Sequence, residues 1–387
     1  MKHTPKTFAS LLLGLIAALT AHHAFAQLAV QPYLQLSPEG GITVMWNTEK
    51  PAYGWVEYGP TAELGHKADL VIEGLRNANT TRHKVVFPFG EHQTLHYRLA
   101  WKNITAFGPY SVTFEDPQYT EILKVSQMPT PDQAVRVAIF NDTHDNLPLF
   151  EKLVAQLEGF DFHFSVFNGD CFADPASEER FIRSLNVYNK GVDSAQRPVI
   201  YHRGNHEYRG AFARELRSWF SPPGGHFYGA FSAGPVRFVM LDAGEDKPDE
   251  NKEYSGLIDF TAYRKEQAEF LKQELAGDAF LDATYRILIH HIPLYNERDA
   301  VFSRLPREVW EDVLNGAPIT LGIHGHTHRH IIHPTNAIGN PYPLAIGGGN
   351  NDASATVTKL EITPEKLTLE MLNVAGEVVE ALEIPAP

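Results

Sequence analysis

The sequence predicts two domains of different class, an N-terminal all-β sandwich followed by an α/β domain. Up to about residue 116, short runs rich in Val, Thr, Tyr, Phe and Trp alternate with Pro, Gly and Asn, which is typical of short strands and their turns. From Val135 onward, strand-like apolar runs alternate with segments whose apolar residues fall at helical spacing. The 387 residues are long enough for about two hydrophobic cores.

Residues 1–26 have the pattern of a secretory signal peptide. Lys2 and Lys6 precede an apolar run at residues 8–19, and Ala-Phe-Ala at 24–26 provides a small-residue cleavage site. The run is too short for a spanning helix, so we predict a periplasmic or secreted protein with no membrane span. An uncleaved anchor is the alternative. The single cysteine, Cys171, rules out an intramolecular disulfide.

The chain is acidic, with a formal net charge of −14. Removal of the two lysines of the signal peptide would make the charge still more negative. Such a protein is not organised for generic binding to nucleic acid or to anionic membranes. A site that handles phosphate would therefore need local cations, and bound metal ions are the obvious candidate. The sequence does not indicate the oligomeric state.

Residues 27–116 are predicted to form the β-sandwich. One of its strands, Ile42–Trp46, alternates apolar and polar residues, as a half-buried strand does. No cluster of titratable side chains with metal-ligand spacing occurs in this region. We interpret it as a module for packing or recognition that resembles a fibronectin type III domain. The predicted strands are Val30–Leu36, Gly41–Asn47, Tyr53–Tyr58, His83–Phe87 and His96–Trp101.

Residues 117–134 contain three prolines and are predicted to link this module to the α/β domain at 135–387. In that domain, apolar spacing predicts helices near residues 150–157, 181–188 and 263–275. The tail returns to strand-like alternation and is expected to complete a sheet of the same domain. The predicted strands are Val135–Phe140, Phe162–Phe167, Pro198–Tyr201, Val236–Leu241, Tyr285–His290, Ile319–Ile323, Ala355–Ile362, Lys366–Leu372 and Glu377–Ile384.

Five of these strands are followed by side chains that can bind a metal, at the strand ends where α/β sheets place their sites. Carboxylate, imidazole and amide oxygen suit a divalent ion such as Zn, Mn or Fe. Seven ligands are too many for one ion but suit two ions that share a bridging carboxylate. The candidates are Asp142 and His144 in NDTHD, Asp170 in GD, Asn205 in GNHE, His291 in HHIP, and His326 and His328 in GHTH.

The motifs DxH, GD, GNHE, HxP and GHxH, in this order, resemble those of the calcineurin-like metallophosphoesterase superfamily. The N-terminal module resembles the fibronectin-like domain that precedes the catalytic domain in purple acid phosphatases. The resemblance implies a four-layer α/β catalytic domain, a β-sandwich flanked by helices. It also implies that Asp142, His144 and His328 hold one metal, that Asp170 bridges, and that Asn205, His291 and His326 hold the other.

Within the same resemblance, His206 would act as general acid or bind a phosphoryl oxygen. His291 is preferred to His290 because the family's ligand stands two residues before the proline. Purple acid phosphatases have a tyrosine ligand shortly after the bridging Asp, whereas this chain has Cys-Phe-Ala at 171–173. They also lack a histidine in the first motif, where this chain has His144. The tyrosinate-to-iron charge transfer that colours those enzymes should therefore be absent from this chain. The stretched spacing GDCFAD leaves open whether Asp174 orients His206.

Together these observations predict a dinuclear metal-dependent hydrolase in which metal-bound hydroxide attacks a phosphate ester. The leading hypothesis is a phosphomonoesterase with a small-molecule substrate and no organic cofactor. A phosphodiesterase of the cyclic-nucleotide or glycerophosphodiester type is the enzymatic alternative, because the motifs do not separate the two. A metal-binding recognition protein without catalysis is the alternative from another class.

Several neighbouring residues have open roles. Arg203 and Arg209 flank the central motif, and either a contact with phosphate or a salt bridge would suit them. Asp242 ends another strand and is a further candidate for supporting the site. Cys171 has no pattern of a reactive thiol and is interpreted as a small buried apolar residue.

Overall fold

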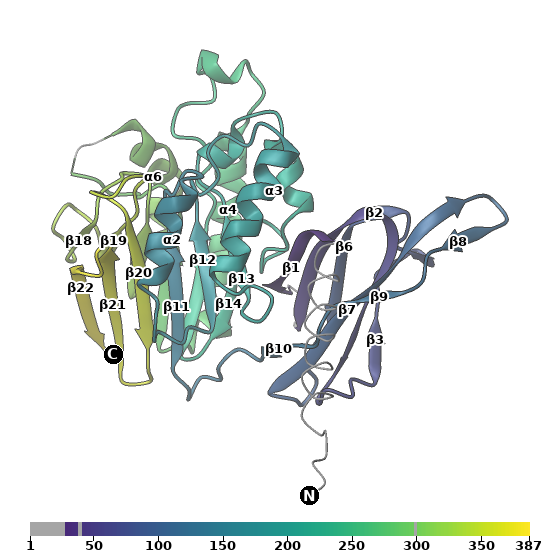
Figure 1. Ribbon diagram of the computed structural model, residues 1–387. Coiled ribbons are helices and arrows are strands. Elements are labelled where there is room, and N and C mark those ends of the chain that lie inside the picture. The colour runs from purple at the N-terminus through teal and green to yellow at the C-terminus, as the bar shows by residue number, and fades with distance from the viewer. Residues whose placement is uncertain (1–27, 38–40, 298–299) are drawn as a thin grey trace, which may run out of the picture. The chain divides into compact units, whose positions relative to one another are not determined.

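The computed structural model describes residues 28–37, 41–297 and 300–387 (Figure 1). The signal peptide predicted at residues 1–26 lies outside these ranges. The chain divides into two compact units, one holding Gly41–Gln127 with most of the first strand, and the other holding Met128–Pro387. No helix in the part of the chain that the structure describes is both long and apolar enough to cross a membrane.

The N-terminal unit is built from β-strands, which confirms the predicted β-rich class. Its core contains the fully buried rings of Trp46, Trp101 and Tyr97. The strands join into an eight-stranded sheet, with a further two-stranded hairpin. The sheet comprises β1 (Leu28–Leu36), β2 (Ile42–Gly59), β3 (His66–Ala68), β6 (Thr80–Phe87), β7 (Thr94–Phe107), β8 (Val112–Phe114), β9 (Gln118–Tyr119) and β10 (Leu123–Ser126), and the hairpin is β4 (Val71–Ile72) and β5 (Leu75–Arg76).

Two expectations about this unit were wrong. Residues 41–47 and 53–58 were expected to be separate strands, but both belong to β2, whose pairing with β6 shifts register between Asn47 and Ala52. Such a bulge accommodates the intervening proline without ending the strand. The expected linker at 117–134 also contributes strands, since β9 and β10 pair with β7.

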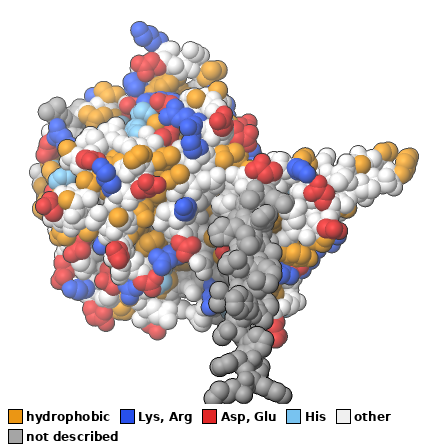
Figure 2. All heavy atoms as spheres, viewed as in Figure 1, with side chains coloured by type: hydrophobic (Ala, Val, Ile, Leu, Met, Phe, Trp, Pro, Cys, Tyr) orange, Lys and Arg blue, Asp and Glu red, His pale blue; other side chains and the backbone are white. Residues whose placement is uncertain are grey.

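The apolar alternation of β10 explains why it joins the sheet. Leu123 and Val125 are buried, and the two residues that follow them in the strand are exposed. This burial outweighs the nearby prolines that favoured a linker. The far end of the β7–β8 hairpin carries apolar side chains at the surface, with Tyr110 99% exposed and Phe107 56% exposed (Figure 2).

The second unit has the expected four-layer α/β arrangement, with helices outside two packed sheets (Figure 1). The sheets meet where Phe164 of β12 packs against Phe231 and Phe238 of the second sheet, with ring centroids 5.6 Å apart in both pairs. The first sheet has the order β13 (Val199–His202), β12 (Phe164–Asn168), β11 (Val135–Phe140), β20 (Thr356–Ile362), β21 (Lys366–Asn373) and β22 (Val378–Pro385). The second has the order β14 (Gly229–Ala233), β15 (Val236–Met240), β16 (Tyr285–Ile289), β17 (Leu321–His324), β19 (Leu344–Ile346) and β18 (Ile331–His333).

The helices cover the outer faces through apolar stripes. Phe150 of α2 packs on the rings of Phe140 and Phe167 in the first sheet. Leu271 of α4 and Trp310 of α6 belong to the buried cluster over the second sheet. The helices are α2 (Leu147–Ala155), α3 (Glu178–Gly191), α4 (Phe260–Leu275), α5 (Asp278–Leu281) and α6 (Val301–Leu314), and the 3-10 turns are η1 (His206–Tyr208), η2 (Ala213–Ser218) and η3 (Lys252–Tyr254).

The direction of the strands brings several loops to one place. Strands β11, β12 and β13 pair in parallel, and so do β15, β16, β17 and β19. The carboxyl ends of parallel strands lie at the same edge of a sheet, so the loops after them are neighbours. The metal-binding candidates of the sequence all lie on these loops.

Candidate active site

The loops after five parallel strands bring all seven predicted ligand residues and His206 into one cluster. Each residue lies within a few positions of the end of β11, β12, β13, β16 or β17. Three sets of side chains have potential ligand atoms within 4.8 Å of one another. These sets are Asp142, His144 and His328; His144, Asp170 and His206; and Asp170, His291 and His326. Asn205 joins the cluster through its amide oxygen, 2.9 Å from Nδ1 of His326.

Sharp backbone turns aim these side chains inward. The φ angle is positive at Asp142 (55°), His144 (47°), Asp170 (52°), His326 (72°) and His328 (52°). Left-handed backbone is uncommon outside glycine and carries a strain of about 1–3 kcal/mol per residue when the surrounding structure imposes it. Its concentration at the ends of three strands indicates that the loops are shaped for a site.

Asp170 occupies the centre of the cluster. Its Oδ2 lies 3.1 Å from Nε2 of His291, 3.8 Å from Nε2 of His144 and 3.9 Å from Nε2 of His206. Its Oδ1 accepts a hydrogen bond from the backbone N–H of His206 at 2.8 Å. The side chain is 2% exposed, so the carboxylate is fixed and faces histidines that come from several different loops.

Asp142 plays the corresponding part at the other end of the cluster. Its carboxylate accepts the backbone N–H of His326 at 3.1 Å and 2.9 Å. Its Oδ1 also lies 3.4 Å from Nε2 of His328 and 3.7 Å from Nε2 of His291. The loop after β17 is thereby held over the loop after β11, with both carboxylates buried.

The electrostatics of the cluster favour a cation. Burial lowers the pKa of His144 and of His326 to about 4, so both rings are neutral and keep a lone pair for a metal. Burial also acts to lower the pKa of His291, but the charges of Asp170 and Asp142 raise it to about 10. Burial would raise the pKa of Asp170, yet His291 and the other rings hold it well below its usual range. Two buried carboxylates therefore create a negative potential at this point.

The donor set fits two divalent ions. It contains two carboxylates, an amide oxygen and four imidazoles, which are the ligand types that Zn, Mn and Fe accept. Nε2 of His291 is buried and lacks a well-aligned hydrogen bond, although Asp170 is near. A buried ring nitrogen held this close to a carboxylate is placed to share a cation with it. Nδ1 of His291 lies 2.9 Å from the backbone oxygen of Asn168, and this contact fixes the orientation of the ring.

His206 lies at the open side of the cluster, between two charged side chains. Its Nδ1 is 2.9 Å from Oδ1 of Asp174, without the alignment of a hydrogen bond. Its Nε2 is 3.1 Å from Nη1 of Arg209. The longer GDCFAD spacing is accommodated by a left-handed turn at Asp174 (φ 49°), which returns its carboxylate to the ring.

Arg203 and Arg209 both form salt bridges. Arg203 donates through Nε and Nη2 to Asp242 at 2.9 Å and 2.8 Å. Its guanidinium also lies 3.8 Å from the centroid of the Phe227 ring. Asp242 is completely buried, so this pair supports the loop after β13. Arg209 pairs with Glu245 and Asp246 while its Nη1 stays beside His206. Arg209 is therefore the arginine that faces the cluster.

Two further expectations concern buried neighbours of the cluster. His290 turns away from the carboxylates, with Nδ1 2.7 Å from the backbone oxygen of Ile292, and its ring packs 4.2 Å from that of His324. His291 instead faces Asp170, as the choice between the two histidines required. Cys171 is buried, and burial raises the pKa of its thiol, as expected of an unreactive residue.

Glu207 is the structural residue that sequence reasoning missed. Its buried carboxylate accepts backbone N–H groups from the loop after β12 and from its own loop after β13. Burial and the nearby charge of Asp170 raise its pKa to about 8, while the donated N–H groups favour the charged form. The four donors are the N–H groups of Asp170, Cys171, Phe172 and Gly204, at 2.8–2.9 Å.

We expect Glu207→Gln to destabilise the fold by about 2 kcal/mol or more. An amide nitrogen would face backbone donors that now meet an oxygen, and buried N–H groups left without an acceptor cost about 1–3 kcal/mol each. Urea unfolding measures the change, with Glu151→Gln on the exposed side of α2 as control. Equal stability of both variants would show that the loop does not depend on this carboxylate.

Comparisons with known proteins were consistent with this geometry. A sequence profile described as calcineurin-like phosphoesterase matches residues 135–330. A purple acid phosphatase from seeds of yellow lupin (Lupinus luteus) has a similar structure, with 16% identity, a TM-score of 0.65, and coverage of 92% of this chain and 74% of that chain. A dimetal phosphatase from Danio rerio has 16% identity, a TM-score of 0.50, and coverage of 67% of this chain and 100% of that chain. Comparison with curated proteins gave no match.

Proposed function

Because the chain belongs to the calcineurin-like phosphoesterase family, whose members hydrolyse phosphoric esters, we propose that it is an exported dinuclear phosphomonoesterase acting on small molecules. The observation that carries this proposal is the buried Asp170 carboxylate at the centre of a cluster of seven metal-ligand side chains. The two structural neighbours, by their names a purple acid phosphatase and a dimetal phosphatase, support a phosphatase rather than a diesterase.

We propose that two ions of Mn, Fe or Zn occupy the cluster, with Asp170 as their shared ligand. When bound, they would polarise the phosphoryl oxygens and lower the pKa of a water molecule. The tyrosine ligand of coloured purple acid phosphatases has no counterpart among residues 171–173. The remaining ligands are Asp142, His144 and His328 for one ion, and Asn205, His291 and His326 for the other.

The protein's own residues would bind the ester and protonate its departing oxygen. His206 would give a proton from Nε2 to the departing oxygen, because this atom faces the cluster while Nδ1 faces Asp174. Asp174 would accept the Nδ1–H and hold the ring with Nε2 toward the ester, and the step itself needs a proton on both ring nitrogens. Arg209, beside Nε2 of His206, would attract the anionic phosphate to the same place.

Hydrolysis of matched chromogenic mono- and diesters tests the proposed function. The mature protein would be stripped of metal and then assayed with Mn, Zn or Fe added back. We expect no turnover without metal, restored turnover with at least one ion, and a higher kcat/KM for the monoester. A higher kcat/KM for the diester would favour the diesterase, and ion binding without turnover of either ester would favour a recognition protein.

Export and the role of the N-terminal unit belong to the same proposal. We propose that residues 1–26 direct the chain to the periplasm or the medium, and that the β-rich unit is a fibronectin type III-like module for packing or recognition. The signal-peptide pattern and the strand texture support these roles. An intact mass of the exported protein that includes residues 1–26 would contradict cleavage.

A further inference from the structure

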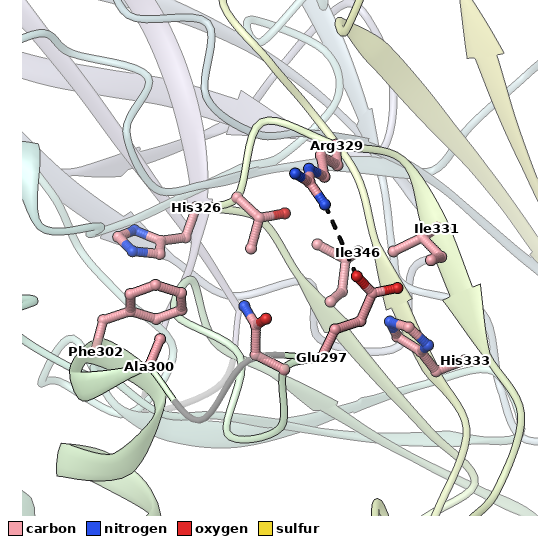
Figure 3. Close-up of a pocket in the computed structure, with 10 residues that line it drawn as sticks. Glu297, Ala300, Phe302, His326, Arg329, Ile331, His333 and Ile346 are labelled. Atoms are coloured by element: carbon pink, nitrogen blue, oxygen red, sulfur yellow. Dashed lines mark ion pairs between the residues drawn. The ribbon is translucent and has the colours of Figure 1, made fainter. Parts of the chain in front are cut away.

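A pocket of about 290 Å³ opens directly beside the ligand cluster (Figure 3). Its walls come from the loops after β16 and β17, the start of α6, strand β18 and the end of β19. His326 belongs both to the cluster and to the pocket wall. A group that fills the pocket would therefore lie against the ring of a candidate metal ligand.

Phe302 forms the boundary between the pocket and the cluster. Its ring packs edge-on against the ring of His326, with centroids 4.5 Å apart and an interplanar angle of 65°. Nδ1 of His326 faces Asn205 in the cluster. Phe302 therefore presents an aromatic surface to a group that extends away from the phosphoryl position.

The opposite wall is aliphatic. Ile346, which is 2% exposed, and Ile331 lie across the cavity from Phe302 (Figure 3). An aromatic wall facing aliphatic side chains favours a flat apolar group between them, because such a group buries both of its faces at once.

The charges around the pocket compensate one another. Nη1 of Arg329 lies 3.8 Å from a carboxylate oxygen of Glu297, and the two form an ion pair across one side of the cavity (Figure 3). No other acidic or lysine or arginine side chain lines the pocket among the described residues. A second phosphate or carboxylate on the substrate would have to compete with Glu297 for Arg329.

We propose that this pocket binds the alcohol part of the ester and selects phosphomonoesters whose leaving alcohol carries a flat apolar ring. The inference rests on the proposed phosphoesterase function and adds the substrate class to it. Phe302 and Ile331 are the two side chains that grip the ring from opposite sides.

The test compares phenyl phosphate with ethyl phosphate, which share the phosphoryl group and differ in the ring. We expect the wild-type enzyme to have the higher kcat/KM for the phenyl ester. Because phenolate is also the better leaving group, the non-hydrolysable pair phenylphosphonate and methylphosphonate measures binding of the ring alone. The inhibition constant for phenylphosphonate should be at least about 10-fold lower than that for methylphosphonate, the range that one extra apolar contact in a pocket gives.

Phe302→Ala and Ile331→Ala should each reduce the ratio of the inhibition constant for methylphosphonate to that for phenylphosphonate by about 5-fold or more. Metal content is measured in every variant. Ile331→Ala leaves in place the Phe302 ring that packs on His326, so a fall in the ratio with unchanged metal content would come from the loss of the pocket wall. Phe107→Ala in the N-terminal unit is the matched control.

Equal inhibition by both phosphonates, or ratios unchanged in both pocket variants, would overturn the inference while leaving the phosphoesterase intact. Absence of turnover with every metal would overturn the proposed function, and the phosphonate ratio would still judge the pocket separately.

Discussion

Replacement of Asp170 by Ala is expected to lower kcat/KM by about 10⁴-fold or more and to remove bound metal at the same time. A 10⁴-fold loss corresponds to about 5.5 kcal/mol of transition-state stabilisation. The physical reason is the position of the carboxylate, whose Oδ2 lies within 3.9 Å of ring nitrogens from three different loops. Its removal would take a charge from both proposed metal positions and leave His291 without its nearest partner.

A second variant separates the charge of the Asp170 side chain from its packing. Asp170→Asn keeps the shape of the side chain and an oxygen that can accept the backbone N–H of His206, but it removes the negative charge. We expect Asn to preserve the fold in urea unfolding and still to lose metal and activity. Asp116→Ala, at an exposed position, is the control. Two ions and normal turnover in Asp170→Asn would contradict the central role of this carboxylate.

The candidate site could be predicted because its information is local. Each ligand stands within a few residues of a strand end, as Asp142 does after β11 and Asn205 after β13. A strand and the turn that follows it are short-range features, so the sequence indicated metal-binding groups at five strand ends, and the resemblance of the ordered motifs to a known family supplied the assignment of each ligand. Parallel pairing, which the alternation of strands and helices indicates, then places the loops together.

Features that depend on contacts distant in sequence could not be predicted. Glu207 stands inside the GNHE motif, but its donors at 170–172 lie more than thirty residues earlier, and no local pattern records them. The position of Asp174 next to His206 depends on a positive φ that the lengthened motif does not reveal. Both residues act on the site through the shape of the loop after β12.

One helix of the second unit was not predicted from the sequence. Helix α6 contains Pro306 in its interior and was not expected, although its buried face, which includes Pro306 and Trp310, follows helical spacing. Burial of this face against the second sheet outweighs the lost backbone hydrogen bond. The pocket beside the cluster depends on this helix, since Phe302 lies in its first turn.

Replacement of His206 by Ala is expected to lower kcat by about 10²–10⁴-fold while both ions stay bound, because general acid catalysis contributes about this factor. The ring stands beside the cluster without being required by either proposed ligand set. Its Nε2 faces Asp170 and Arg209, and its Nδ1 faces Asp174. Metal content by elemental analysis and steady-state turnover measure the two effects, with His226→Ala at an exposed position as control.

The dependence on the leaving group decides between the two roles proposed for His206. A general acid matters most when the departing alkoxide is basic, so ethyl phosphate should lose far more activity than p-nitrophenyl phosphate in His206→Ala. A residue that only binds a phosphoryl oxygen would cost both esters equally, because their phosphoryl groups are the same. Asp174→Asn should show the same selectivity at about one tenth of the magnitude if its carboxylate orients the ring. Equal losses for the two esters would therefore assign His206 to phosphoryl binding and remove proton transfer from its role.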